Sequence, residues 1–311
     1  MSDPPDPIRA AAPGPWWEKL VVSLEFADLS DPGTRERLDS VAAKVNSQGM
    51  ATAAAWRYGR ALPMLTAAIE IWARLERPAG EVVARNARGS VLRRVGDYAA
   101  AEEDHRAALA LSREHDLPGS AVTACVGLGS ICTERGDLLQ AAQWLDEAER
   151  LSAGMSDERG AAQTQYTWGL CHEAGKDWDA ALRAYGLAVE RWRALGGRAE
   201  AIEATAGVVR VLLAQGQGVA AYSLAEEVLA HLGEHGPARL DEPLRVYWTI
   251  YRALHFMRQA DAAQQVLDMA HMLLQRQAED LAPEQQRRFL EEVSVNRAIE
   301  TAWYNAHQHS Q

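Results

Sequence analysis

Two stretches of the chain decide its fold: VGDYAAAEED (Val95–Asp104) and RGDLLQAAQW (Arg135–Trp144). Each carries a Gly-Asp pair, at 96–97 and at 136–137, so the two pairs lie forty residues apart. Glycine readily takes the positive φ that ends many helices, and aspartate is a good helix N-cap. Each pair is therefore typical of a tight turn between two helices, and the spacing suggests an internal repeat.

Four columns of residues keep the same forty-residue spacing along the chain. A large residue follows each turn, two alanines come three and ten residues after it, and a glycine precedes each turn by seven residues. The columns are Tyr58, Tyr98, Leu138 and Trp178; Ala61, Ala101, Ala141, Ala181 and Ala221; Ala68, Ala108, Ala148 and Ala188; and Gly49, Gly89, Gly129 and Gly169. A fifth copy departs from them at Val209, Gly218 and Val228. Independent columns with one period indicate a repeat protein.

Each copy reads as two antiparallel helices. In AVTACVGLGSICTER (121–135) the apolar residues recur at three- and four-residue steps, and DLLQAAQWLDEAERL (137–151) resumes that period after the turn. Small residues allow helices to approach closely, so we expect glycine on the first helix to face alanine on the second. Pro63 is unfavourable inside a helix, so the second helix of the first pair is expected to begin near Leu62. No stretch alternates as a strand does, which predicts an all-α fold.

The glycine column, the Gly-Asp turn and the alanines at fixed offsets resemble the tetratricopeptide repeat (TPR). The forty-residue unit is longer than the usual repeat of about 34 residues. It is similar to the repeats of kinesin light chain and of the C-terminal TPR arms of bacterial signalling regulators. The resemblance implies a right-handed superhelical solenoid of about six helix pairs.

A stacked array needs caps, because each unit buries its face only against a neighbour. Apolar helical patterns at both ends of the chain suit this role, so we expect the chain to be complete. The predicted segments are a disordered tail (1–14), an N-terminal capping helix and linker (15–39), the TPR solenoid (40–280), a C-terminal capping helix (281–306) and a second disordered tail (307–311).

The composition excludes several classes of function. The 43 acidic residues outnumber the 32 basic ones, for a net charge of −11, whereas nucleic-acid binding usually needs a basic surplus. No apolar run is long enough for a membrane span or a signal peptide. The three cysteines include no CxxC pair, which fits a reducing cytoplasm. We therefore expect a cytoplasmic protein that binds neither nucleic acid nor membrane.

The sequence carries no pattern typical of catalysis. Gly175-Lys176 lacks the rest of a phosphate-binding loop, and no GxSxG or HExxH motif occurs. Cys125 and Cys132 lie on one helical face, where they could pack in the core or, with partners a repeat away, hold a metal. We expect packing, and we predict no enzyme, no metal site and no cofactor.

The concave surface of a TPR solenoid is lined by the first helix of each pair. Asn46 and Asn86 match the asparagine with which repeats similar to kinesin light chain bind a peptide backbone, and an amide offers donor and acceptor together. Arg93 or Arg94 could bind a carboxylate, or could pair with an acid of a neighbouring repeat. The groove residues that the resemblance implies are Asn46, Asn86, Ser90, Arg93, Arg94, Thr123, Ser130, Gln163, Tyr166, Glu173, Arg210 and Arg252, with Glu203 and Arg245 on the same line.

Trp16 and Trp17 could seal the first repeat or anchor a partner at the edge of the groove. The first hypothesis is thus a non-enzymatic scaffold or adaptor that binds a partner protein or peptide in its groove. The alternative is a regulatory subunit that senses a peptide or small molecule and acts on a separate effector. The oligomeric state stays open.

Overall fold

The structure is a computed structural model that describes residues 27–308. These residues form 14 α-helices and no strand, which confirms the all-α prediction. The predicted tail at 1–14 lies outside the described residues, as do residues 15–26 of the predicted N-terminal capping helix and linker, which include Trp16 and Trp17.

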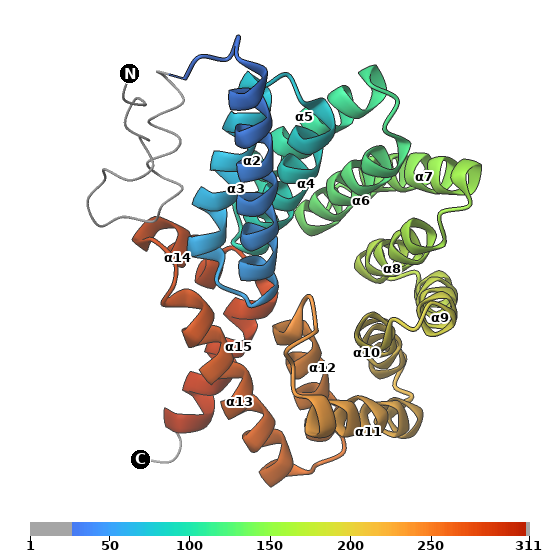
Figure 1. Cartoon of the computed structure of the whole chain (residues 1–311). Coiled ribbons are helices and arrows are strands. Elements are labelled where there is room, and N and C mark those ends of the chain that lie inside the picture. Colours follow the sequence, from blue (N-terminus) through green and yellow to red (C-terminus); the bar gives the residue numbers. More distant parts are fainter. Residues whose placement is uncertain (1–26, 309–311) are drawn as a thin grey trace.

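Six consecutive helix pairs form a solenoid, followed by two further helices (Figure 1). The pairs are α2 (Pro32–Ala54) and α3 (Tyr58–Arg74); α4 (Pro78–Arg94) and α5 (Tyr98–Glu114); α6 (Pro118–Arg135) and α7 (Leu138–Met155); α8 (Glu158–Ala174) and α9 (Trp178–Ala194); α10 (Arg198–Ala214) and α11 (Gly218–His235); α12 (Pro243–Phe256) and α13 (Ala260–Ala278). The last helices are α14 (Pro283–Glu291) and α15 (Ser294–Gln308).

The turns repeat every twenty residues, at half the period seen in the sequence. Turns within a pair and turns between pairs are alike, because each short turn places one residue in the left-handed region. Those residues are Trp56, Glu76, Gly96, Asp116, Gly136, Ser156, Lys176, Gly196, Gly216 and, in the sixth pair, Arg258. The longer α11–α12 connection differs, because Gly236 combines a φ of 63° with an extended ψ of −173°. The predicted caps are present: Asp97 accepts a hydrogen bond from Ala100 N, and Asp137 from Gln140 N, both at 3.3 Å.

The glycine column packs against large side chains and not, as expected, against the alanine column. A Cβ at each glycine would overlap or press on a side chain sixteen residues later, on the second helix of the same pair. The pairs are Gly49 with Leu65, Gly89 with His105, Gly129 with Leu145, and Gly169 with Tyr185. In the fifth pair the sizes are exchanged, because Val209 and Ala225 occupy these two positions. What the repeats share is therefore a small residue packed against a larger one, so that the two side chains together fill the space between the helices.

The solenoid closes on itself, so that the last helices lie beside the first ones (Figure 1). The rings of Tyr58 on α3 and Phe289 on α14 meet edge to face at 6.4 Å. Arg288 on α14 forms an ion pair with Asp97, at the start of α5. The first helices α4, α6, α8, α10 and α12 contact one another in turn and form the inner wall of this ring.

Two helix starts differ from the sequence-based boundaries. The first pair begins at Pro32, upstream of the predicted 40, because Asp31 caps α2 by accepting a hydrogen bond from Thr34 N at 2.8 Å. Helix α3 begins at Tyr58 and includes Pro63. Leu62 and Leu65 are buried on either side of this proline, and their packing offsets the single backbone hydrogen bond that it removes.

The C-terminal cap consists of two helices where the sequence predicted one over 281–306. The helix is interrupted at residues 292–293, and side chains donate hydrogen bonds to backbone carbonyl groups that lose their helical partners there. Asn296 Nδ2 donates to Phe289 O and Arg297 donates to Glu291 O, both at 2.9 Å. Helix α15 then continues to Gln308, so His307 belongs to a helix and not to the predicted tail.

Candidate functional site

A cavity of about 250 Å³ lies on the inner face of the ring, and we call it the inner cavity. Five of the predicted groove residues line it: Arg93 on α4, Ser130 on α6, Gln163 and Tyr166 on α8, and Glu203 on α10. The other lining residues are Arg159, Thr167, Leu170, Trp192, Glu200, Arg239, Asp241 and Glu242. Residues from four consecutive first helices therefore meet around one space, as the repeat geometry implies.

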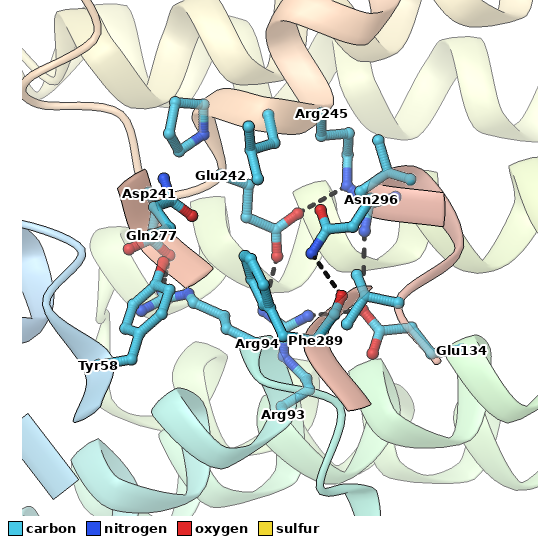
Figure 2. A pocket seen from close by; sticks show the side chains of 14 residues that line it. Tyr58, Arg93, Arg94, Glu134, Asp241, Glu242, Arg245, Gln277, Phe289 and Asn296 are labelled. Atoms are coloured by element: carbon cyan, nitrogen blue, oxygen red, sulfur yellow. Dashed lines mark hydrogen bonds and ion pairs between the residues drawn. The ribbon is translucent and has the colours of Figure 1, made fainter. Parts of the chain in front are cut away.

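Beside the inner cavity, a cluster of charges joins α4 and α6 to the start of α12 (Figure 2). We call this cluster, which consists of Arg93, Arg94, Glu134, Asp241, Glu242 and Arg245, the charged seam. Arg93 contacts Glu134 and Glu242, each at 2.6 Å. Arg94 pairs with Asp241, and Arg245 binds Glu242 at 2.6 Å.

The charges of the seam neutralise one another. Burial alone would raise the pKa of Glu242, but the positive charges of Arg245 and Arg93 hold this pKa far below its usual value. Burial raises the pKa of Glu134, and Arg93 offsets only part of that effect. The sequence left two roles open for Arg93 and Arg94. In the structure both arginines pair with acidic residues of this chain, and some of these acids lie more than 140 residues away in the sequence.

A second buried ion pair lies farther along the inner wall. Arg210 on α10 binds both carboxylate oxygens of Glu173 on α8, with Nε–Oε1 and Nη2–Oε2 distances of 2.9 Å. The Tyr185 hydroxyl donates to the same carboxylate at 2.6 Å. Burial would raise the pKa of Glu173, but Arg210 and these hydrogen bonds lower it overall. Two predicted groove residues thus lie together and bind each other.

The two predicted asparagines lie apart from the inner cavity. Asn86 is buried, donates from Nδ2 to Ser120 O at 3.0 Å, and has its Oδ1 3.1 Å from His105 Nδ1. Asn46 is also buried, and its Nδ2 lies 3.6 Å from Met50 Sδ. The Asn86 amide therefore joins α4, α5 and α6 within the protein.

The remaining predicted residues are dispersed. Ser90 donates to Asn86 O at 3.0 Å, within its own helix. Thr123 and Arg252 are exposed and line none of the cavities found among residues 27–308 that involve the inner wall. The structure therefore brings together Arg93, Ser130, Gln163, Tyr166 and Glu203, and joins Glu173 to Arg210.

Several residues of this region were absent from the sequence-based prediction. Glu134 lies forty residues after Arg94, at the same place in the repeat, and this alternation of charge was a usable signal. Asp241 and Glu242 belong to the connection between α11 and α12, where the forty-residue register shifts, so no column identified them. Trp192 on α9 packs in the core and also lines the cavity.

The structure adds three observations on other kinds of site. Cys125, Cys132 and Cys171 are buried free thiols, and burial raises the pKa of Cys125 to about 11. Within residues 27–308 no group of three or more His, Cys, Asp or Glu side chains is placed to hold a metal ion. None of the helices described is long and apolar enough to cross a membrane.

Comparison with known proteins supports the fold. No family model and no curated protein matches the sequence. Among solved structures, a Rap protein complexed with competence and sporulation factor superposes with a TM-score of 0.61 at 12% identity, over 94% of this chain and 84% of the Rap chain.

Two further structures are similar. The Rap conjugation gene regulator of plasmid pLS20, in complex with the Phr* peptide, gives a TM-score of 0.58 at 12% identity, over 79% of this chain and 70% of that one. BtubC (BKLC) from P. vanneervenii gives 0.52 at 16% identity, over 76% and 89%. At these identities the likeness concerns the fold alone, and the fold is the TPR-like solenoid that the sequence predicts.

Proposed function

We propose that this protein is a non-enzymatic interaction scaffold whose inner cavity binds a peptide or a short segment of a partner protein. The observation that carries the proposal is the convergence of Ser130, Gln163 and Tyr166 on one cavity. Hydroxyl and amide groups both donate and accept hydrogen bonds, as recognition of a peptide backbone requires. A volume of about 250 Å³ suits a few residues of an extended chain and excludes a folded domain.

The comparisons support the peptide part of this proposal. Two of the similar structures hold a ligand named as a sporulation factor or as a Phr* peptide. Non-enzymatic action is supported by the charged seam, because its acids and bases are held in ion pairs with one another. The proposal includes a cytoplasmic location, which the three free thiols support.

A cavity-filling variant tests the proposal. Gln163→Trp would place an indole in the inner cavity, whereas Leu187→Trp changes an exposed side chain on the outer helix α9. Each full-length protein is immobilised, exposed to native lysate, and its bound peptides and proteins are quantified by mass spectrometry after circular dichroism has verified equal helix content. We expect wild type and Leu187→Trp to retain the same ligand and Gln163→Trp to lose it. Equal retention by Gln163→Trp would show that the inner cavity is not the binding site.

A further inference from the structure

One buried carboxylate on the wall of the inner cavity lacks a positive partner. Glu203, on α10, is only 6% exposed, and its Oε1 accepts a hydrogen bond from Glu242 N at 2.6 Å. No Lys, Arg or His of residues 27–308 lies within 4.0 Å of it, and its Oε2 has no hydrogen bond there. Asp104, also a buried acid, contacts both Arg85 and Arg88. An unpaired buried carboxylate is costly unless another group compensates it.

The basic side chains around the inner cavity are already engaged or lie in solvent. Arg93 is held by the charged seam. Arg159 is largely exposed, lies 3.8 Å from Glu200, and rests over the Trp192 ring at 5.4 Å. Arg239 is exposed on the connection before α12. None of the three neutralises Glu203, so a place for a positive charge is left at the cavity wall.

The protonation of Glu203 agrees with this arrangement. Burial raises the pKa of Glu203 well above its usual value, and the negative charge of Asp241 raises it further. The hydrogen bond from Glu242 N and the positive charge of Arg94 offset only part of this rise, so Glu203 holds its proton more readily than an exposed glutamate does while the cavity is empty. A ligand cation would favour the carboxylate instead, and the proton would pass to the solvent.

We propose that Glu203 forms a subsite of the inner cavity for a positively charged group of the ligand, namely an ammonium or guanidinium group. The inference rests on the proposed function, since it names the chemistry of the peptide that the cavity would bind. A lysine or arginine side chain or a free peptide N-terminus carries such a group. Tyr166 lines the same cavity and can add the attraction of an aromatic ring for a cation.

The test uses two synthetic pentapeptide pools on the full-length protein. One pool has free N-termini and contains lysine and arginine; the other is N-acetylated and replaces both with norleucine. The variant is Glu203→Gln, which keeps an oxygen to accept the hydrogen bond from Glu242 N. The matched control is Glu190→Gln, which removes the same charge from an exposed position of α9 outside the inner cavity.

We expect wild type and Glu190→Gln to select the cationic pool, and Glu203→Gln to lose about tenfold or more in affinity for the selected peptide, as removal of one partner of a buried pair usually does. Calorimetry in buffers of different ionisation enthalpy should show proton release on binding by wild type and none by Glu203→Gln. Selection of the cationic pool by Glu203→Gln with unchanged affinity, or selection of the norleucine pool by wild type, would overturn the cation subsite and leave the proposed function standing. Binding of neither pool would instead overturn the proposed function.

Discussion

His105 shows how much a single buried side chain contributes to this array. The imidazole is fully buried and lies between Gly89 of its own pair and Gly127 of the next pair. Because Asn86 Nδ2 donates to Ser120 O, its Oδ1 faces the ring, so His105 Nδ1 must carry a proton and donate. Nε2 has no hydrogen-bond partner among residues 27–308, and the neutral ring is the form that this site fits.

This burial makes stability depend on pH. Burial, together with the positive charge of Arg93, lowers the pKa of His105 to about 4, below its ordinary value of 6.5. The unfolded chain therefore binds a proton at a higher pH than the folded protein does. The contribution of His105 to the free energy of unfolding is fully present above pH 6.5. It is lost as the pH falls from 6.5 towards 4, by up to about 3 kcal/mol.

The measurement is the urea midpoint at intervals from pH 7.5 to pH 4. The comparison is His105→Asn, which can still donate to Asn86 but does not titrate. We expect the variant to be less stable at pH 7.5 and to lose less stability on acidification than wild type does. Parallel curves for the two proteins would mean that other groups cause the acid sensitivity.

At the scale of the helix, the glycines of the repeated column are explained by close packing, because a side chain at these positions would meet the second helix of the pair. Gly169 lies within α8, where alanine would favour the helix by about 1 kcal/mol, but its Cβ would overlap the ring of Tyr185. Gly186 lies within α9 and has open space around it. We expect Gly169→Ala to destabilise the protein by about 1–3 kcal/mol and Gly186→Ala to stabilise it by about 0.5–1 kcal/mol. Chemical denaturation of both variants measures this, and a stabilising Gly169→Ala would contradict the packing described.

The elements that could be predicted from the sequence are those set by local chemistry. Gly136 and Asp137 define their turn through a preferred φ and a side-chain cap, so both could be identified without a structure. The residue that packs against each glycine could not be predicted in this way. Two candidates lie on the second helix, namely the alanine and the large residue sixteen positions after the glycine. Which of them meets the glycine depends on which face of that helix points towards the first helix. A check of summed volume at the two positions, as in Val209 and Ala225, would have favoured the correct face.

The candidate site was predicted only where it follows the repeat. Ser130, Gln163 and Tyr166 reach the inner cavity because each occupies a groove position on a first helix. Arg93 was placed on the correct wall, but its partner Glu242 lies 149 residues away, and ring closure brings the two together. The curvature that closes the ring is the sum of small rotations at every pair, and no single residue specifies it.

At the scale of the whole molecule, the charged seam should hold the ring closed. Arg93→Met would remove the ion pairs of Arg93 with Glu134 and with Glu242. Glu242 would keep its ion pair with Arg245. Removal of one partner from a buried pair usually costs about 3–5 kcal/mol, and we expect the lower part of this range because Arg245 remains. The double variant Arg93→Met/Glu134→Gln should recover part of the loss in a double-mutant cycle of unfolding free energies. Additive effects of the two changes would show that Arg93 and Glu134 are not coupled.

Ring closure also depends on a backbone contact that carries no charge. Gly59, the second residue of α3, lies so close to the end of α13 that a Cβ would overlap the carbonyl oxygen of Asp280. Gly119 is the second residue of α6 and has nothing within 4 Å of a Cβ, so it is a matched control. Alanine favours the helix at both positions, and the two variants differ only in what the new methyl group meets.

We therefore expect Gly59→Ala to open the ring while the helix pairs stay folded, because separating α3 from α13 costs less than unfolding either pair. Small-angle X-ray scattering should show a larger radius of gyration for Gly59→Ala than for Gly119→Ala and wild type, with equal circular dichroism at 222 nm. If the inner cavity binds its ligand only in the closed ring, Gly59→Ala should also lose the ligand that Gly119→Ala retains. An unchanged radius of gyration would mean that the ends adjust locally around the methyl group, and that the remaining contacts, among them Tyr58–Phe289 and Arg288–Asp97, are enough to keep the ring closed.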